Sequence, residues 1–87
     1  MIDSFELKLS FGKVLIRVSS KSKDKKRMVI KRKSESDFNF KTIYSNIFMN
    51  KYYDLRMDKG NAYKYKILLF DGSGNYSVSE SKSVRIK

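Results

Sequence analysis

The chain has 87 residues, of which 40% are hydrophobic and 14% aromatic, and it lacks cysteine, histidine, proline and tryptophan. This length accommodates one hydrophobic core, and therefore a single domain spanning residues 1–87. Without cysteine or histidine the chain has no disulfide, no thiolate metal site and none of the usual general bases and nucleophiles. The formal net charge of +11 favours nonspecific contact with polyanions.

The first three predicted strands cover residues 5–9, 13–19 and 27–33. Apolar and polar residues alternate in the first strand, and Gly12 marks the turn that follows it. In the second strand, Val14, Ile16 and Val18 share one face. Their β-branched side chains suit the packed surface of a strand.

The remaining predicted strands cover residues 38–44, 52–57, 63–70 and 76–86. From Tyr63 to Leu69 apolar residues occupy every odd position and lysines occupy two of the even ones, which is typical of a strand with one buried face. Residues 45–51 have no clear period, and we expect an irregular crossover or a single helical turn there. Seven short strands separated by turn signals predict an all-β fold, a seven-stranded antiparallel β-sandwich.

The region 53–77 carries the most informative pattern. Tyr63 stands six residues after Met57, the turn residue Gly60 lies between them, and the alternating strand that follows closes on an Asp…Gly-Asn-x-Ser hairpin. This pattern resembles the second half of a fibronectin type III domain. The resemblance implies three strands packed on four, and a buried corner tyrosine, Tyr63, whose hydroxyl bonds to the backbone just upstream. Val18 stands where that family usually carries a tryptophan, which leaves an immunoglobulin-like relative as the alternative.

The carboxylates give no basis for catalysis. The chain has nine of them, and none forms a pair within an apolar run, where burial would perturb its ionisation. Asp54, Asp58 and Asp71 fall beside glycines or at strand ends, where aspartate serves turns. We therefore expect no enzyme activity, no catalytic residue, no metal site and no cofactor.

A candidate contact patch lies on the outward face of the 63–70 strand. Leu68 and Phe70 would point outward there, beside Lys64 and Lys66, and Val29 would face the same way from the neighbouring strand of the family topology. Together, Val29, Leu68 and Phe70 would form an apolar patch rimmed by lysines, as at many contacts between domains or proteins. The alternative is that a neighbouring strand folds over these side chains.

A basic run between the second and third strands holds five cations: Lys21, Lys23, Lys25, Lys26 and Arg27. We interpret it either as a contact for an anionic polymer, such as teichoic acid, a glycosaminoglycan or nucleic acid, or as a solvated loop. A dedicated nucleic-acid site would favour arginine, whose fork binds phosphate and guanine edges, but lysine dominates here. Tyr52 and Tyr53 offer rings for a sugar, although one residue of an adjacent strand pair is normally core.

We expect no signal peptide at Met1–Ser4, because these residues lack a basic start followed by an apolar stretch. No apolar run approaches the roughly 18 to 20 residues that span a bilayer, so we expect no membrane insertion. We expect a monomeric fragment of a longer, exported bacterial protein, located outside the cell or on its surface. The expected function is a noncatalytic spacer or protein-interaction module that contacts neighbouring domains or another protein. The alternative is a module that binds carbohydrate or an anionic cell-surface polymer, weakly in the case of general polyanions.

Overall fold

The computed structural model describes residues 4–10, 12–19, 26–58, 60–79 and 81–86. Eight strands follow one another along the chain: β1 (Ser4–Ser10), β2 (Lys13–Ser19), β3 (Arg27–Ser34), β4 (Lys41–Ile47), β5 (Lys51–Asp54), β6 (Ala62–Phe70), β7 (Tyr76–Val78) and β8 (Lys82–Arg85). Every pairing between them is antiparallel. The described ranges contain no helix of the length and hydrophobicity that crossing a bilayer requires.

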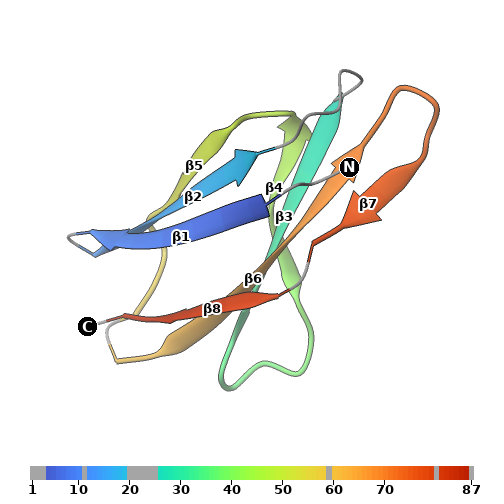
Figure 1. The fold of residues 1–87 in the computed structure, drawn as a ribbon. Helices are drawn as coiled ribbons and strands as arrows, with labels where there is room; N and C mark the ends of the chain where they lie inside the picture. Colours follow the sequence, from blue (N-terminus) through green and yellow to red (C-terminus); the bar gives the residue numbers. More distant parts are fainter. Residues whose placement is uncertain (1–3, 11, 20–25, 59, 80, 87) are drawn as a thin grey trace.

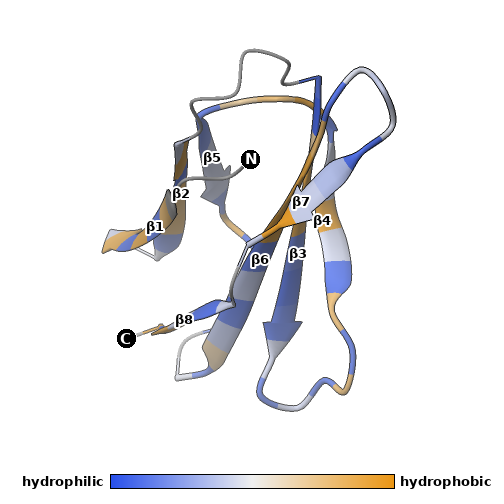
Figure 2. Ribbon diagram, turned by 45° about the vertical axis from the view of Figure 1, so that its right-hand side comes forward, coloured by the Kyte–Doolittle hydropathy of each residue, from blue (hydrophilic) through white to orange (hydrophobic). Residues whose placement is uncertain are grey.

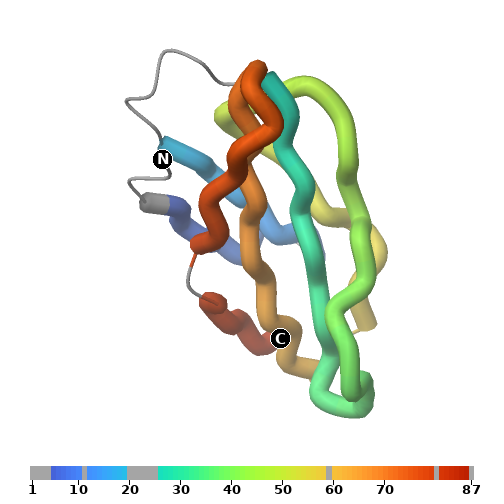
Figure 3. The backbone as a smooth tube through the Cα atoms, turned by 90° about the vertical axis from the view of Figure 1, so that its right-hand side faces the viewer, coloured from blue at the N-terminus to red at the C-terminus, as the bar shows by residue number. Residues whose placement is uncertain are grey.

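The strands form two sheets that pack face to face (Figure 1). The first sheet has the strand order β1-β2-β5, and the second has the order β4-β3-β6 with both β7 and β8 on the remaining edge of β6. Figure 2 separates the two layers, with β1, β2 and β5 on one side and β3, β4, β6 and β7 on the other. In Figure 3, β3, β4 and β6 run side by side along the length of the molecule. The fold is an immunoglobulin-like β-sandwich.

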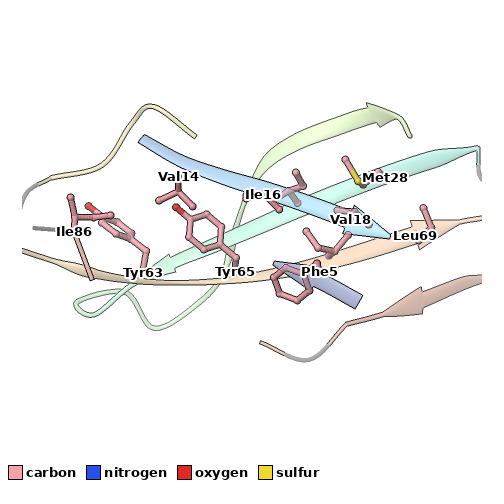
Figure 4. Close-up of a cluster of buried hydrophobic side chains, with 11 residues drawn as sticks. Phe5, Val14, Ile16, Val18, Met28, Tyr63, Tyr65, Leu69 and Ile86 are labelled. Atoms are coloured by element: carbon pink, nitrogen blue, oxygen red, sulfur yellow. The ribbon is translucent and has the colours of Figure 1, made fainter. Parts of the chain in front are cut away.

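One hydrophobic core fills the space between the sheets (Figure 4). It is formed by buried side chains of both layers: Phe5, Val14, Ile16, Val18, Met28, Ile30, Tyr63, Tyr65, Ile67, Leu69 and Ile86. On β6 every odd position from Tyr63 to Leu69 is buried and no even position is, which confirms the alternation predicted for this strand. On the second strand Val14, Ile16 and Val18 are all in the core as predicted, but Leu15, on the opposite face, is buried as well.

The prediction of one continuous last strand is wrong, because the structure divides residues 76–86 into β7 and β8 and so has eight strands rather than seven. Ser79 lies at the break. Its hydroxyl accepts a hydrogen bond from the Ile67 amide at 2.8 Å, and its own amide donates to the Ile67 carbonyl at 2.9 Å. A side chain here takes the place of a main-chain carbonyl, so the ladder along this edge of β6 is interrupted.

The fourth strand also differs from its predicted position. It covers Lys41–Ile47 instead of 38–44, and it occupies part of the segment for which the sequence predicts an irregular crossover. The pairing with β3 shifts at a bulge that leaves Ile43 as an extra residue. An extra residue breaks the period of two, so alternation alone misplaces this segment. Phe38, which the sequence assigns to the strand, is 95% exposed in the preceding turn.

Candidate interaction surface

A polar cluster lies between the two sheets, where the chain leaves β5. Asp54 is 3% exposed, and its carboxylate accepts hydrogen bonds from Arg32 of β3 at 2.8 and 3.0 Å and from the Tyr65 hydroxyl of β6 at 2.7 Å. The Arg56 amide donates to the same carboxylate at 3.2 Å. The cluster therefore joins the first sheet, through β5, to two strands of the second.

Burial is the largest influence on both side chains that bind Asp54. It raises the pKa of Tyr65 far above the usual tyrosine value, and the hydrogen bond to Asp54 raises it further. For Arg32, burial disfavours the cation, but the hydrogen bond and the charge of Asp54 outweigh it, so its pKa is raised overall. Asp54 is therefore bound by a guanidinium cation and a neutral phenol at neutral pH.

The interpretation of Asp54 as a turn residue misses most of its role. A signal was present in the sequence, since Arg32 shares the inward face of β3 with Met28 and Ile30. An arginine on a buried face requires an anionic partner. The described residues contain no group of three His, Cys, Asp or Glu side chains placed to hold a metal ion. Asp54 connects the end of β5 to two strands of the other sheet, which indicates a structural role.

The turn before β6 gives Tyr63 the environment that the resemblance implies for a corner tyrosine. Tyr63 is buried, and its hydroxyl accepts a hydrogen bond from the Asp58 amide at 2.9 Å. Gly60 has a φ of 87°, which a residue with a Cβ rarely adopts. The Met57 sulfur lies 3.3 Å from the Tyr65 hydroxyl, so the turn also contacts the polar cluster. Met57, Gly60 and Tyr63 thus belong to one turn, in which Tyr63 is buried and Gly60 is exposed.

The aromatic side chains of β5 do not form a flat row for a sugar. Tyr52 packs its ring against Tyr44, with 5.1 Å between the ring centres, whereas Tyr53 is exposed under the ammonium group of Lys13. Adjacent strand residues face opposite ways, so the two rings do not lie side by side in one plane. A hollow of ≈ 360 Å³ opens beside β5, and both tyrosines line it together with Arg32.

The outward face of the second sheet brings together the three residues of the predicted contact patch. Val29 of β3 lies directly opposite Leu68 of β6, and Phe70 lies two residues further along the same face. All three side chains are half-buried. Part of the cover over Phe70 comes from Tyr76 of β7, whose ring centre is 5.3 Å away.

Three further residues, all exposed, extend this surface: Ile47, Tyr76 and Val78. We call the whole surface the apolar patch, which comprises Val29, Ile47, Leu68, Phe70, Tyr76 and Val78. Tyr76, at 61% exposure, lies opposite Phe70, and Val78 lies opposite Leu68. The outward position of Tyr76 and Val78 could have been predicted from the alternation of the last strand. Ile47 could not, because it lies beyond the bulge of β4.

Arg27 connects the predicted patch with the predicted basic run. It is exposed on β3 opposite Phe70, and its guanidinium donates a hydrogen bond to the Ser45 hydroxyl of β4. Lys26, which precedes it, is also exposed. The other cations of the run, Lys21, Lys23 and Lys25, lie outside the described residues. The structure therefore locates only one end of the basic run, at the rim of the apolar patch.

No protein-family model matches the chain, and no curated protein sequence matches it. Its structure is similar to that of pectate lyase PelI from Erwinia chrysanthemi, described in complex with tetragalacturonic acid, with a TM-score of 0.83 and 14% identity over 93% of this chain and 27% of that chain. It is also similar to pectate lyase Pel3 from Pectobacterium carotovorum, with a TM-score of 0.81 and 16% identity over 95% of this chain and 26% of that one.

A further similar structure is the twitchin kinase region from C. elegans, described as Fn31-NL-kin-CRD-Ig26. The TM-score is 0.73 and the identity 11%, over 91% of this chain and 15% of that one. At sequence identities this low, the comparisons establish only that these structures share the fold of this chain. The chain spans about a quarter of the length of the two lyases, and less of the twitchin region.

Proposed function

We propose that this chain is a noncatalytic, fibronectin type III-like module of a longer protein, in which it spaces neighbouring domains and contacts one of them. The observation that carries the proposal is the unequal coverage of the similar structures. More than nine tenths of this chain matches 27%, 26% and 15% of three longer chains. The same sandwich is thus a minor part of each of those chains, as an accessory module would be.

The strand pairing supports the fibronectin type III-like assignment. The fourth strand, β4, pairs with β3 and so belongs to the second sheet. In a constant-type immunoglobulin domain the fourth strand pairs in the other sheet, beside the fifth. If the broken edge formed by β7 and β8 is taken as one strand, three strands pack on four, as the resemblance implies.

The two ends of the described chain support a spacer. β1 begins opposite Ser19, at the far end of β2 from Val14. Ile86 lies at the Val14 end of the core (Figure 4), where its amide donates to the Asn61 carbonyl at 2.8 Å. Segments that continue in both directions would leave from opposite ends of the sandwich. We extend the proposal to an exported bacterial protein, the setting that the resemblance implies.

The apolar patch is the surface that we assign to the neighbouring domain. Half-buried and exposed apolar side chains on this sheet face would contribute about 25 cal/mol for each Å² that a partner covers. Arg27 at the rim would give such a contact a polar border.

The experiment compares the whole gene product with a form that lacks residues 1–87. We expect the shortened protein to keep its turnover or binding of a small soluble ligand, and to lose thermal stability or domain orientation measured by small-angle scattering. A coding sequence without any further domain, or a loss of turnover on deletion, would contradict the accessory role.

A second candidate function is the binding of an acidic polysaccharide. The net charge of +11 favours it, and so does the similarity to a lyase described in complex with tetragalacturonic acid, an acidic oligosaccharide. The test is retardation of the chain in a native gel that contains polygalacturonate, with neutral dextran as the reference. Equal mobility in both gels would remove this candidate.

A further inference from the structure

Two pairs of like charges face each other on the outward side of the second sheet. In the register between β3 and β6, Lys31 lies opposite Lys66, and Lys33 lies opposite Lys64. Neighbouring strands are about 4.8 Å apart, and residues two positions apart along a strand are separated by about 6.7 Å. These four residues, which we call the lysine quartet, therefore project from a small rectangle of the sheet. Like charges directly opposite each other destabilise a sheet, so the quartet is unfavourable unless an anion binds it.

No carboxylate forms an ion pair with a quartet lysine within the part of the chain that the structure describes. Both ion pairs found there involve other residues. The Lys31 ammonium donates to the Thr42 hydroxyl at 3.3 Å, and the Lys66 ammonium lies 4.4 Å from the centre of the Phe40 ring. These partners position two of the lysines but are neutral, so the positive charge remains uncompensated.

One end of the quartet opens into a hollow. Lys33 and Lys64 line this space of ≈ 350 Å³ together with Arg85, Glu35, Ser34, Ser83 and Ala62. Glu35 is paired with Arg85, whose guanidinium lies 3.2 Å from its carboxylate oxygen, so the two lysines give the hollow its excess positive charge. The serine hydroxyls add neutral hydrogen-bonding groups of the kind that bind sugar hydroxyls. The hollow thus combines ammonium groups for acids with hydroxyls for polar, uncharged groups.

The chemistry of the quartet fits a chain of single negative charges better than a nucleic acid. A lysine ammonium is a mobile point charge and lacks the planar fork with which arginine binds phosphate and guanine. Sites for single-stranded nucleic acid also expose aromatic faces on which bases stack. The ring beside the quartet, Phe40, is covered by the Lys66 ammonium.

We infer that the lysine quartet binds a linear acidic polysaccharide with carboxylates on successive sugars. The inference rests on the second candidate function above, the binding of an acidic polysaccharide, and assigns its binding site. The polymer lies across β3 and β6, and its carboxylates pair with lysines that have no such partner within the described chain. Because binding removes the repulsion between the paired lysines, the polymer also raises the melting temperature of the chain.

The test compares two double variants of equal net charge. Lys64→Gln with Lys66→Gln removes one lysine from each facing pair, and Lys8→Gln with Lys51→Gln removes two exposed lysines from the first sheet. Dissociation constants for polygalacturonate are measured by affinity electrophoresis at several salt concentrations. We expect the quartet variant to bind roughly tenfold more weakly with a flatter salt dependence, and the control to stay within about twofold of the parent. The quartet variant should melt no lower than the parent, because it loses repulsion.

Each other outcome overturns a different part of the inference: the site, the candidate function or the class of polymer. Equal weakening in both variants would remove the quartet as the site and leave polymer binding in place. A parent chain that polygalacturonate does not retard would remove both the site and the candidate function. Tighter binding of single-stranded DNA than of polygalacturonate, lost in the quartet variant, would replace the polysaccharide with a nucleic acid.

Discussion

Arg32 and Asp54 join the two sheets through one ion pair, in which a single guanidinium nitrogen lies 2.8 and 3.0 Å from the two carboxylate oxygens. The Arg32 side chain is 21% exposed and the Asp54 side chain 4%. A carboxylate this buried depends on its partner, because an unpaired charge in a medium of low dielectric is strongly unfavourable. Separation of β5 from β3 therefore breaks the pair and exposes the Tyr65 hydroxyl as well.

Asp54→Asn is expected to lower the free energy of unfolding by about 3 kcal/mol, since it leaves the Arg32 cation without a counter-charge. The partial exposure of Arg32 sets the loss at the low end for a buried pair. Urea unfolding followed by circular dichroism measures it. The matched control is Asp58→Asn, which neutralises an exposed carboxylate in the loop that follows. Similar losses in both variants would contradict a special role for the ion pair.

Tyr63→Phe is expected to cost about 1 to 2 kcal/mol of unfolding free energy, because it leaves the Asp58 amide without its hydrogen-bond acceptor. The ring stays in the core, so the change isolates the hydroxyl. Tyr76→Phe removes the same group from an exposed ring and serves as the reference. If the two variants melt at the same temperature, the corner hydrogen bond contributes nothing measurable.

Phe70→Ser and Leu69→Ser should separate the two faces of β6. Leu69 is buried in the core, and its loss is expected to cost several kcal/mol, in the range of about 2 to 5. Phe70 is half-buried against Tyr76, so its loss should cost about 1 kcal/mol in the isolated chain and weaken the contact with a neighbouring domain. Equal destabilisation by both substitutions, measured by thermal unfolding, would place Phe70 in the core.

Alkaline pH is expected to unfold the chain partly through Tyr65. Burial raises the pKa of Tyr65 in the folded chain above its unfolded value, so the folded state holds the proton more tightly. This contribution to stability is complete below about pH 10, the pKa of a free tyrosine, and is lost as the pH rises further. Melting temperatures between pH 8 and pH 12 should fall more steeply for the parent than for Tyr65→Phe. Parallel slopes would show that other groups cause the decline.

The sequence predicts the sandwich well where alternation runs without interruption. β6 is the clearest case, since a single strand supplies four buried residues to the core at every second position. Alternation fails at Ile43 and at Ser79, because a bulge and a side-chain hydrogen bond depend on the neighbouring strand rather than on the local period.

The candidate surfaces also contain some residues that the sequence predicts and others that it does not. Val29 and Leu68 follow from alternation and topology, but the facing of Lys31 and Lys66 depends on the register between strands that are far apart in the sequence. That register is set by turns and by the core, so no reading of either strand alone could have found it. The sequence indicates that Arg32 needs an anionic partner, but the identity of that partner, Asp54, depends on the packing of the two sheets.

The bulge in β4 and the break between β7 and β8 occupy the two outer edges of the five-stranded sheet. A long regular edge offers a row of free amides and carbonyls, and a second molecule can add its own strand to that row. Here each edge is kinked or shortened before such a row becomes long. Edge-to-edge pairing between copies of the chain is therefore unfavourable at this sheet.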